Sequence, residues 1–403
     1  MTRPPSLRLT LAVAGIAALA GATDARSQQR AKSSLPVQLQ VLYMPPPFRA
    51  DGRSGMAYEV HLANYRDLDL TLLSLDVLPA DDTTRRLATL SGPDLLRCLR
   101  RPGRPAATPD PALIHGGEFA VVFVWFALDS ATAAPRALVH RAVFERRMAD
   151  GTSRRYTVEG AVVDVPSRSP FAIRPPVPAG RWLLANGPSM LGPHRLDLQA
   201  VDGRATSSQR FASDWMLLGA DGRLADSTAA GNGSWHGYGS PVLAVADGEV
   251  VEVRDGIPEN EPLAAERAVP NRRETIGGNS LVLRVGSGVF AYYAHLRPGS
   301  LRVAVGDRVR SGQVLAQIGN SGNSDAPHLH FHLTDSADPL AGEGVPFALD
   351  AFRVLDVLSA EGWDPMVQQH APWQPPVGGR AMLRRREMPT GDAVIEFQNR
   401  MTP

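Results

Sequence analysis

Hydrophobic and polar residues alternate in short runs over the N-terminal part of the chain. Residues 58–63, Tyr-Glu-Val-His-Leu-Ala, place an apolar side chain at nearly every second position. A period of two is typical of strands that bury one face. Turn-forming Asp-Gly, Gly-Gly and Pro clusters separate similar runs at 70–77, 119–127, 137–144 and 155–165. Several short strands at this spacing, with little helical period, predict a β-sandwich over residues 35–165.

A proline-rich segment separates this region from a second group of predicted strands. Five prolines fall within residues 166–178. Proline fixes φ and lacks an amide donor, so we expect an extended linker at 166–180. Strand patterns then resume without intervening helices, which predicts a mostly antiparallel sheet over residues 181–357. These strands are expected at 241–245, 249–253, 280–285, 289–295, 314–318 and 327–333.

Two segments of the second region fall outside the strand pattern. The long charged segment 255–278 contains three prolines. Because loops of this length are usually functional or disordered, it is either a wall of a substrate cleft or a surface excursion. Residues 358–403 form a C-terminal tail to which the sequence assigns no role.

The N-terminus has the features of an export signal. Arg3 and Arg8 precede an apolar run, 9–22, that ends in small residues. This run is shorter than the ~20 residues that span a bilayer. We therefore expect residues 1–22 to be a secretory signal peptide or, if it is not cleaved, a membrane anchor. Cys98 is the only cysteine, and an exported protein without disulfides fits the bacterial periplasm or the cell surface.

Charge and composition narrow the class of function. The chain has 403 residues, of which 42 are basic, 41 are acidic and 43% are hydrophobic. A net charge of +1 argues against a protein that coats nucleic acid. A single cysteine offers no thiolate cluster for a metal. Lys32 is the only lysine, so lysine-dependent chemistry has no candidate residue further along the chain.

Three histidines alternate with apolar residues in the segment 327–333. In an extended strand His328, His330 and His332 would project to one face, while the intervening apolar residues pack into a core. Neighbouring imidazolium ions repel one another, so the cluster favours neutral rings. Neutral imidazole is the form that binds zinc. His295 ends another predicted strand and could face the same surface.

A hydrolytic zinc site of two histidines also needs a carboxylate and an open position for water. Asp214 lies among apolar residues in the segment 209–215. An acid in such surroundings is costly unless it is paired or bound to a cation. Asp214 is therefore the candidate carboxylate.

Five motifs in this order resemble those of the LytM/lysostaphin-type zinc endopeptidases of bacterial cell walls. They lie between about His194 and Phe347, which is under half of the chain, at 241–250, 293–296, 305–313, 319–324 and 327–331. With this resemblance, the predicted fold is all-β. An immunoglobulin-like β-sandwich precedes a mostly antiparallel LytM-like peptidase domain of the duplicated hybrid motif type.

The resemblance also implies a set of site residues. Asp214 and His330 would hold zinc (Zn2+), and His295 and His328 would form the catalytic pair. His332 stands where relatives often have glutamate, so it either orients a ligand or lies exposed.

One position departs from the family pattern. The first zinc-binding histidine usually stands four residues before the aspartate, where this chain has Arg210. Arginine stays protonated and cannot replace a neutral imidazole. We expect His194 to supply the missing ligand, with His236 as the second choice. If neither does so, the site is incomplete.

The function that the resemblance implies is zinc-dependent hydrolysis of peptide bonds in peptidoglycan stem or cross-bridge peptides, outside the cytoplasmic membrane. His295 and His328 would share the tasks of general base and oxyanion stabiliser. The alternative is a non-catalytic LytM-like regulator that binds and activates another cell-wall hydrolase. Arg210 is the residue that favours this alternative.

Overall fold

The computed structural model describes residues 35–104, 109–129, 133–226 and 230–398. The expected signal peptide, residues 1–22, lies outside this part of the chain. Neither helix among the described residues has the length and apolar character needed to cross a bilayer. The chain from residue 35 onward packs as one unit.

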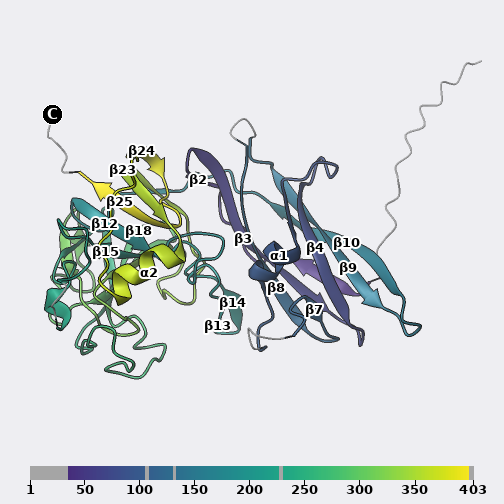
Figure 1. The fold of residues 1–403 in the computed structure, drawn as a ribbon, viewed down its shortest axis with the longest axis horizontal. Helices are drawn as coiled ribbons and strands as arrows, with labels where there is room; N and C mark the ends of the chain where they lie inside the picture. The colour runs from purple at the N-terminus through teal and green to yellow at the C-terminus, as the bar shows by residue number, and fades with distance from the viewer. Residues whose placement is uncertain (1–34, 105–108, 130–132, 227–229, 399–403) are drawn as a thin grey trace, which may run out of the picture. The chain divides into compact units, whose positions relative to one another are not determined.

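The N-terminal region is a sandwich of two sheets (Figure 1). Val60 and Val122 from one sheet share a buried cluster with Leu75 and Phe144 from the other, so the two sheets enclose one core. A β-sandwich is therefore present, and its immunoglobulin-like topology stays a prediction. The first sheet contains β1 (Val37–Gln40), β2 (Phe48–Ala50), β3 (Arg53–Asn64), β6 (Leu99–Arg100) and β8 (Phe119–Ala127); the second contains β4 (Leu70–Pro79), β5 (Ala88–Ser91), β7 (Leu113–Ile114), β9 (Ala137–Arg147) and β10 (Ser153–Asp164), and helix α1 (Gly92–Cys98) joins β5 to β6.

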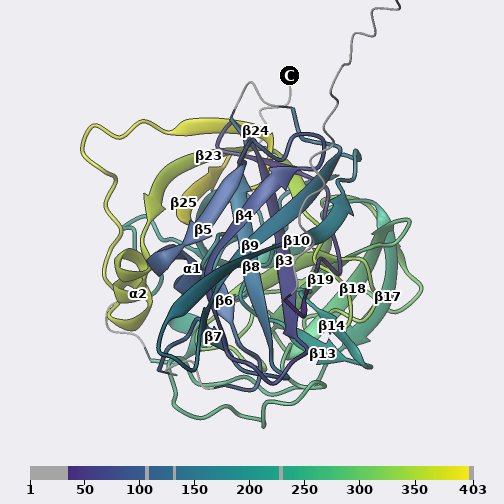
Figure 2. The ribbon, with the colours of Figure 1, turned by 90° about the vertical axis from the view of Figure 1, so that its right-hand side faces the viewer.

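The rest of the chain is organised around one long sheet. Its strands follow the order β11-β23-β25-β12-β15-β22-β19-β18-β17-β20, and β24 pairs with β23. Among the strand pairs of the described residues, only β11 and β23 run parallel, which agrees with the mostly antiparallel sheet expected from the hairpin-length spacing. Figure 2 shows β17, β18 and β19 as neighbours. The strands are β11 (Phe171–Ile173), β12 (Gly180–Ala185), β15 (Ser213–Leu217), β17 (Gly248–Arg254), β18 (Asn279–Gly286), β19 (Val289–Leu296), β20 (Arg308–Val309), β22 (Leu329–Thr334), β23 (Phe347–Leu358), β24 (Met382–Glu387) and β25 (Asp392–Phe397).

Smaller elements surround this sheet. Two further two-stranded sheets pair β13 with β14 and β16 with β21. Residues 360–397, for which the sequence predicts no element, form helix α2 and strands β24 and β25. Strand β25 lies between β12 and β23 in the long sheet, so this segment is part of the fold. The bounds are β13 (Gln199–Val201), β14 (Arg204–Thr206), β16 (Pro241–Leu243), β21 (Val314–Gln317), α2 (Ala360–Gln368) and the 3-10 turn Asn232–Ser234.

Strand β22 carries the alternating histidine segment, and it is paired on both edges. His330 lies opposite Asp214 of β15 on one side and opposite Ala294 of β19 on the other. Residues directly opposite each other in an antiparallel pair project to the same face. The register therefore brings Asp214 and His330 together. On the other face, Leu329, Phe331 and Leu333 belong to the core cluster and have no exposed surface.

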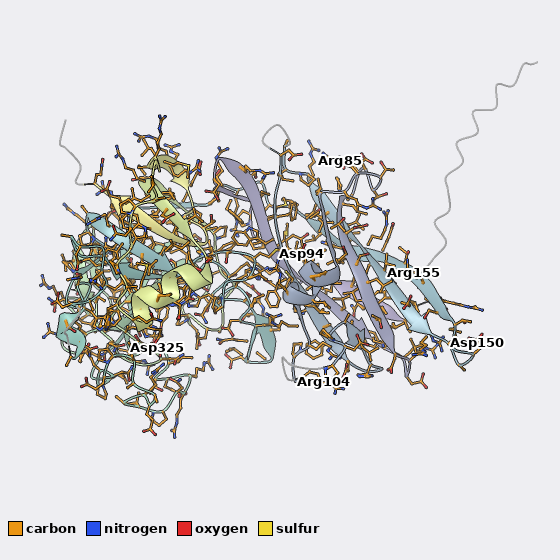
Figure 3. All side chains as sticks on the ribbon, in the orientation of Figure 1. Arg85, Asp94, Arg104, Asp150, Arg155 and Asp325 are labelled. Carbon is orange, nitrogen blue, oxygen red and sulfur yellow. The ribbon has the colours of Figure 1, made fainter. Side chains whose placement is uncertain are left out.

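Charged side chains of both signs are interspersed on the surface. Some of them pair, as Arg97 does with Asp94 and Arg104 does with Glu118. Exposed pairs contribute about 0–1 kcal/mol each, so burial of apolar side chains between the sheets is the larger stabilising contribution. Figure 3 labels six exposed examples: Arg85, Asp94, Arg104, Asp150, Arg155 and Asp325.

We expect Phe331→Ala to lower the free energy of unfolding by about 3–5 kcal/mol. The Phe331 ring is fully buried between Tyr293 and Phe347, and its loss leaves a cavity in the core. Urea unfolding followed by tryptophan fluorescence measures the change. The fully exposed Val377 provides the control Val377→Ala, expected within about 0.5 kcal/mol of the wild type. Equal unfolding midpoints for Phe331→Ala and the control would contradict the prediction.

Candidate metal centre

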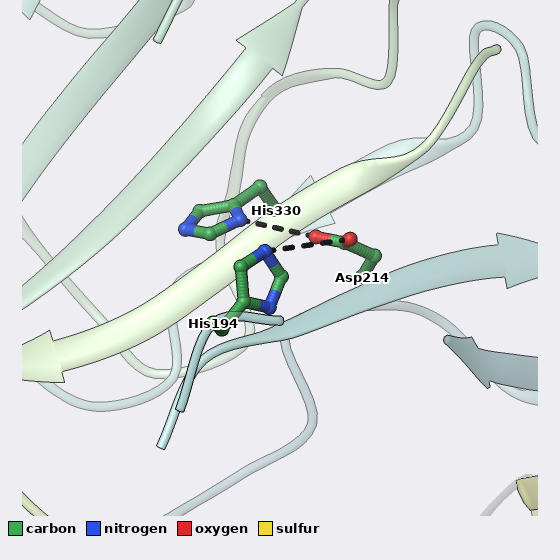
Figure 4. A group of neighbouring side chains, drawn as sticks. All are labelled: His194, Asp214 and His330. Atoms are coloured by element: carbon green, nitrogen blue, oxygen red, sulfur yellow. Dashed lines mark hydrogen bonds and ion pairs between the residues drawn. The ribbon is translucent and has the colours of Figure 1, made fainter. Parts of the chain in front are cut away.

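Two histidines and one aspartate meet at one end of the β15–β22 pair. His194, Asp214 and His330 each offer one ligand atom, and these atoms lie within 4.8 Å of one another (Figure 4). His330 Nδ1 is 3.0 Å from one Asp214 oxygen, and His194 Nε2 is 3.6 Å from the other. Two imidazoles and a carboxylate are the donor set of a hydrolytic zinc site, which keeps a coordination position for water.

His194 reaches this group from a turn. The strand that pairs with the segment around Asp214 is β12, and it ends at Ala185 opposite Asp214. His194 follows on the turn 193–196. Pro193 has no amide to donate and Gly192 weakens a strand, so this segment does not extend the sheet. His194 thus lies beside Asp214 on a turn and not on a strand.

Asn186 is a site residue that sequence reasoning missed. Its backbone carbonyl accepts a hydrogen bond from His194 Nδ1 at 3.0 Å, and its side-chain amide donates to Asp214 at 2.9 Å. Asn186 has a φ of +51°, a left-handed conformation that asparagine tolerates better than most residues. The Asn-Gly pair at 186–187 marks a turn, which was the available signal. One residue thus orients two members of the group.

Arg210, at the usual position of the first ligand, and His236, the second choice for it, both lie elsewhere. The Arg210 guanidinium is buried and faces Glu59 and Glu343. His236 Nε2 lies 4.0 Å from both Asp221 and Asp226, and His236 is not in the group of converging ligand atoms. The position four residues before Asp214 therefore contributes no ligand atom to this group.

The electrostatics of the group favour an anionic Asp214 carboxylate. Burial alone would raise the pKa of Asp214, but the nearby His194, His328 and His330 rings hold that pKa well below its usual range. Burial lowers the pKa of His330, and the neighbouring Asp214 carboxylate only partly offsets this. The site therefore places an ionised carboxylate beside imidazole rings, which bind a divalent cation in their neutral form.

A chain of hydrogen bonds determines which nitrogen of His330 is free. The carbonyl of Pro339 can only accept, so His332 donates to it through Nε2–H at 3.3 Å. Burial lowers the pKa of His332 well below its usual range, so its Nδ1 carries a lone pair. That lone pair accepts Nε2–H from His330 at 3.0 Å. His330 Nδ1 is then unprotonated and faces Asp214, and His332 is fully buried rather than exposed.

His194 is oriented in a similar way, because its Nδ1 lies 3.0 Å from the backbone carbonyl of Asn186. Its Nε2 therefore faces Asp214. Two ring nitrogens and a carboxylate thus converge within 4.8 Å of one another. Neutral imidazole and carboxylate are ligands that zinc prefers. This convergence is the strongest structural indication that the group can hold a metal ion.

His295 and His328 flank the group. Each points a ring nitrogen at a backbone carbonyl: His295 Nδ1 lies 2.8 Å from the carbonyl of Ser321, and His328 Nδ1 lies 2.8 Å from that of Ala326. The two ring centroids are 4.8 Å apart. His295 has a φ of +60°, a strained conformation for a residue with a side chain, and strain of this kind gathers at functional sites.

The group opens into a cavity of about 400 Å³. Ile276 and Gly277, at the end of the long charged segment 255–278, line this cavity. His295 is hydrogen-bonded to the same segment through Gly277. The segment 255–278 was expected to be either a wall of a substrate cleft or a surface excursion. Its last residues agree with the first of these interpretations. The lining also includes His194, His295, His330, His332, Tyr292, Asn323 and Leu340.

Comparison with known proteins agrees with this chemistry. Residues 234–341 match Peptidase family M23. The chain is 34% identical over 116 residues to the glycyl-glycine endopeptidase ALE-1 of Staphylococcus capitis, which covers 28% of this chain and 27% of that protein. It is 31% identical over 116 residues to lysostaphin of Staphylococcus simulans, covering 28% and 20% of the two chains. The chain thus spans about a quarter or less of the length of these curated relatives.

Among solved structures, the catalytic domain of lysostaphin from Staphylococcus simulans is similar, with 26% sequence identity, a TM-score of 0.20, and coverage of 30% of this chain and 84% of that chain. The segment that matches the family contains His295, His328 and His330, and it begins after His194 and Asp214. Residues 234–341 thus match peptidase family M23, and the structure places His194 and Asp214, from the preceding residues, beside the His330 of this segment.

Proposed function

We propose that this protein is an exported zinc metalloendopeptidase that hydrolyses peptide bonds in peptidoglycan stem or cross-bridge peptides. The observation that carries the proposal is the convergence of His194 Nε2, His330 Nδ1 and the Asp214 carboxylate. The relative named a glycyl-glycine endopeptidase supports a peptide substrate. Action on the cell wall requires export to the periplasm or the cell surface. The features of residues 1–22 support such export.

In this proposal His194, Asp214 and His330 hold the metal. Bound zinc supplies Lewis-acid chemistry for the scissile carbonyl and for water. The cavity beside the group offers room for an extended peptide. The domain limits that we propose are 35–165 for an immunoglobulin-like sandwich, 166–180 for the linker and 181–357 for a peptidase domain of the duplicated hybrid motif type.

His295 and His328 are the proposed acid–base pair. Their Nδ1 atoms are engaged by backbone carbonyls, so Nε2 is the nitrogen of each ring that is left for proton transfer. One of these atoms can accept a proton from the attacking water. The resulting imidazolium can then donate to the oxyanion or to the leaving amine.

The non-catalytic alternative depends on Arg210, which occupies the usual position of a zinc ligand. In our proposal the missing ligand is His194 on the turn 193–196, whose Nε2 lies 3.6 Å from Asp214. This proximity supports the enzyme over the regulator. A regulator would have other cell-wall enzymes as its partners.

The first prediction concerns the metal ligands. We expect the wild-type protein to bind one equivalent of zinc, and His194→Ala to weaken zinc binding by more than the ~10–100-fold that loss of an outer partner costs. His236→Ala is the matched control and is expected to bind zinc as the wild type does. Metal analysis and competition with a chromophoric chelator measure both. Full zinc affinity in His194→Ala would refute the ligand assignment.

The second prediction concerns His332. We expect His332→Leu to weaken zinc binding by about 10–100-fold, because His330 loses the partner that fixes its ring proton. His332→Gln should retain most of the affinity, since its amide can accept from His330 and donate to Pro339. The same chelator competition measures both variants. If the two variants bind zinc equally, the hydrogen-bond chain does not act as described.

The third prediction concerns catalysis. We expect His328→Ala and His295→Ala to keep their zinc while kcat falls by about 10²–10⁴-fold, because proton transfer is lost without loss of the metal. His330→Ala should lose both zinc and activity. The assay is release of soluble fragments from purified sacculi, with an oligoglycine peptide as a second substrate. Equal release by the wild type and His330→Ala would remove the proposed function.

A further inference from the structure

Four charged side chains form a buried cluster close to the metal centre. Glu59, Arg195, Arg210 and Glu343 have side chains that are between 1% and 6% exposed. Glu59 lies on β3 of the sandwich, whereas the other three belong to the chain beyond the proline-rich segment. Glu59 accepts from Arg195, and from Arg210 at 2.6 and 3.0 Å. One carboxylate of the sandwich therefore holds two arginines of the catalytic region.

Arg195 is bound almost entirely by the sandwich. Besides its bond to Glu59, it donates to the carbonyls of Tyr58 at 2.8 Å and Val124 at 3.1 Å. Its guanidinium also lies over the Phe123 ring at 4.9 Å. These acceptors come from β3 and β8, two adjacent strands of one sheet. Arg195 is thus fixed from several directions at once.

The residue before Arg195 is His194. The turn 193–196 that carries both is in no strand, and its backbone bonds within the described residues are local, from Leu196 to Gly192 and from Asp197 to His194. A ligand on such a turn loses conformational freedom when it binds a metal, which weakens binding unless the turn is ordered beforehand. The bonds of Arg195 to the sandwich provide that order.

We propose that Glu59 of the sandwich is a positioning residue for the metal centre: by holding Arg195 it fixes the turn that presents His194, so that docking of the sandwich completes the site. This inference rests on the proposed function, in which His194, Asp214 and His330 hold zinc. The proposal also explains Arg210, which stands where the family usually has a histidine. Arg210 belongs to the same buried cluster and anchors the segment that leads to Asp214.

A double-mutant comparison tests the proposal in the full-length protein. Zinc affinity is measured by chelator competition for the wild type, Glu59→Gln, His194→Ala and the double variant. We expect Glu59→Gln to bind zinc about 10–100-fold more weakly than the wild type. In the His194→Ala background, Glu59→Gln should cause no further loss, because the ligand that it positions is already absent and Arg210 keeps Glu343 as its partner at 2.7 Å.

Asp76→Asn is the matched control. Asp76 is another buried acid of the sandwich, and its partners Arg86 and Thr89 belong to the sandwich as well. We expect this variant to bind zinc with wild-type affinity even if its melting temperature falls. This control separates the loss of a charge pair within the sandwich from the loss of the bond that reaches the metal centre.

Three results would overturn the proposal: wild-type zinc affinity in Glu59→Gln, an equal loss in Asp76→Asn, or losses from Glu59→Gln and His194→Ala that multiply in the double variant. If circular dichroism shows that Glu59→Gln does not fold, Arg195→Gln replaces it in the same comparison, since Glu59 then keeps Arg210 as a partner. A wild-type protein that binds no zinc would instead refute the proposed function.

Discussion

The metal centre depends on the pairing of strand β22 on both of its edges. Because β15 and β19 fix its register, the face of the sheet on which each of its side chains lies is determined. Phe331 and its apolar neighbours fill the core, and the histidines are held on the opposite side beside Asp214. A slip of one residue would exchange the two faces, burying imidazoles in the core and exposing the aromatic ring. The hydrophobic core and the site chemistry thus select the same register.

Within this strand register, hydrogen bonds to the histidine rings determine which ring nitrogens face the metal centre. The Nδ1 atoms of His194, His295 and His328 lie against backbone carbonyls, and His332 accepts the ring proton of His330. The Nε2 atoms of His194 and His328 therefore face Asp214, at 3.6 and 3.5 Å. Carbonyls cannot donate, so this orientation is a property of the backbone fold. A neutral imidazole with one engaged nitrogen is preorganised for a cation or a proton, and needs little rearrangement when either arrives.

Much of this could be predicted from sequence where the determining pattern is local. The alternation in 327–333 predicts both faces of β22, and the burial of an acid among apolar residues singles out Asp214. The pairing partners of each strand depend on long-range register, so the sequence does not place His194 beside Asp214 through a turn, nor assign Asn186 to orient both. Arg210 is the clearest case. Read alone it indicates a damaged site, but its meaning depends on Glu59, which lies 151 positions away in the chain.

The position of β25 in the long sheet bears on how the protein is made. This strand, residues 392–397, lies between β12 and β23, and β12 is the neighbour of the strand that carries Asp214. During synthesis β12 emerges early and has an open edge until β25 arrives. Because domains commonly fold as the ribosome releases them, the sheet beneath the metal centre stays incomplete until nearly the whole described chain is available. The order of strands thus makes completion of the sheet beside the metal centre depend on a segment that is synthesised after His330.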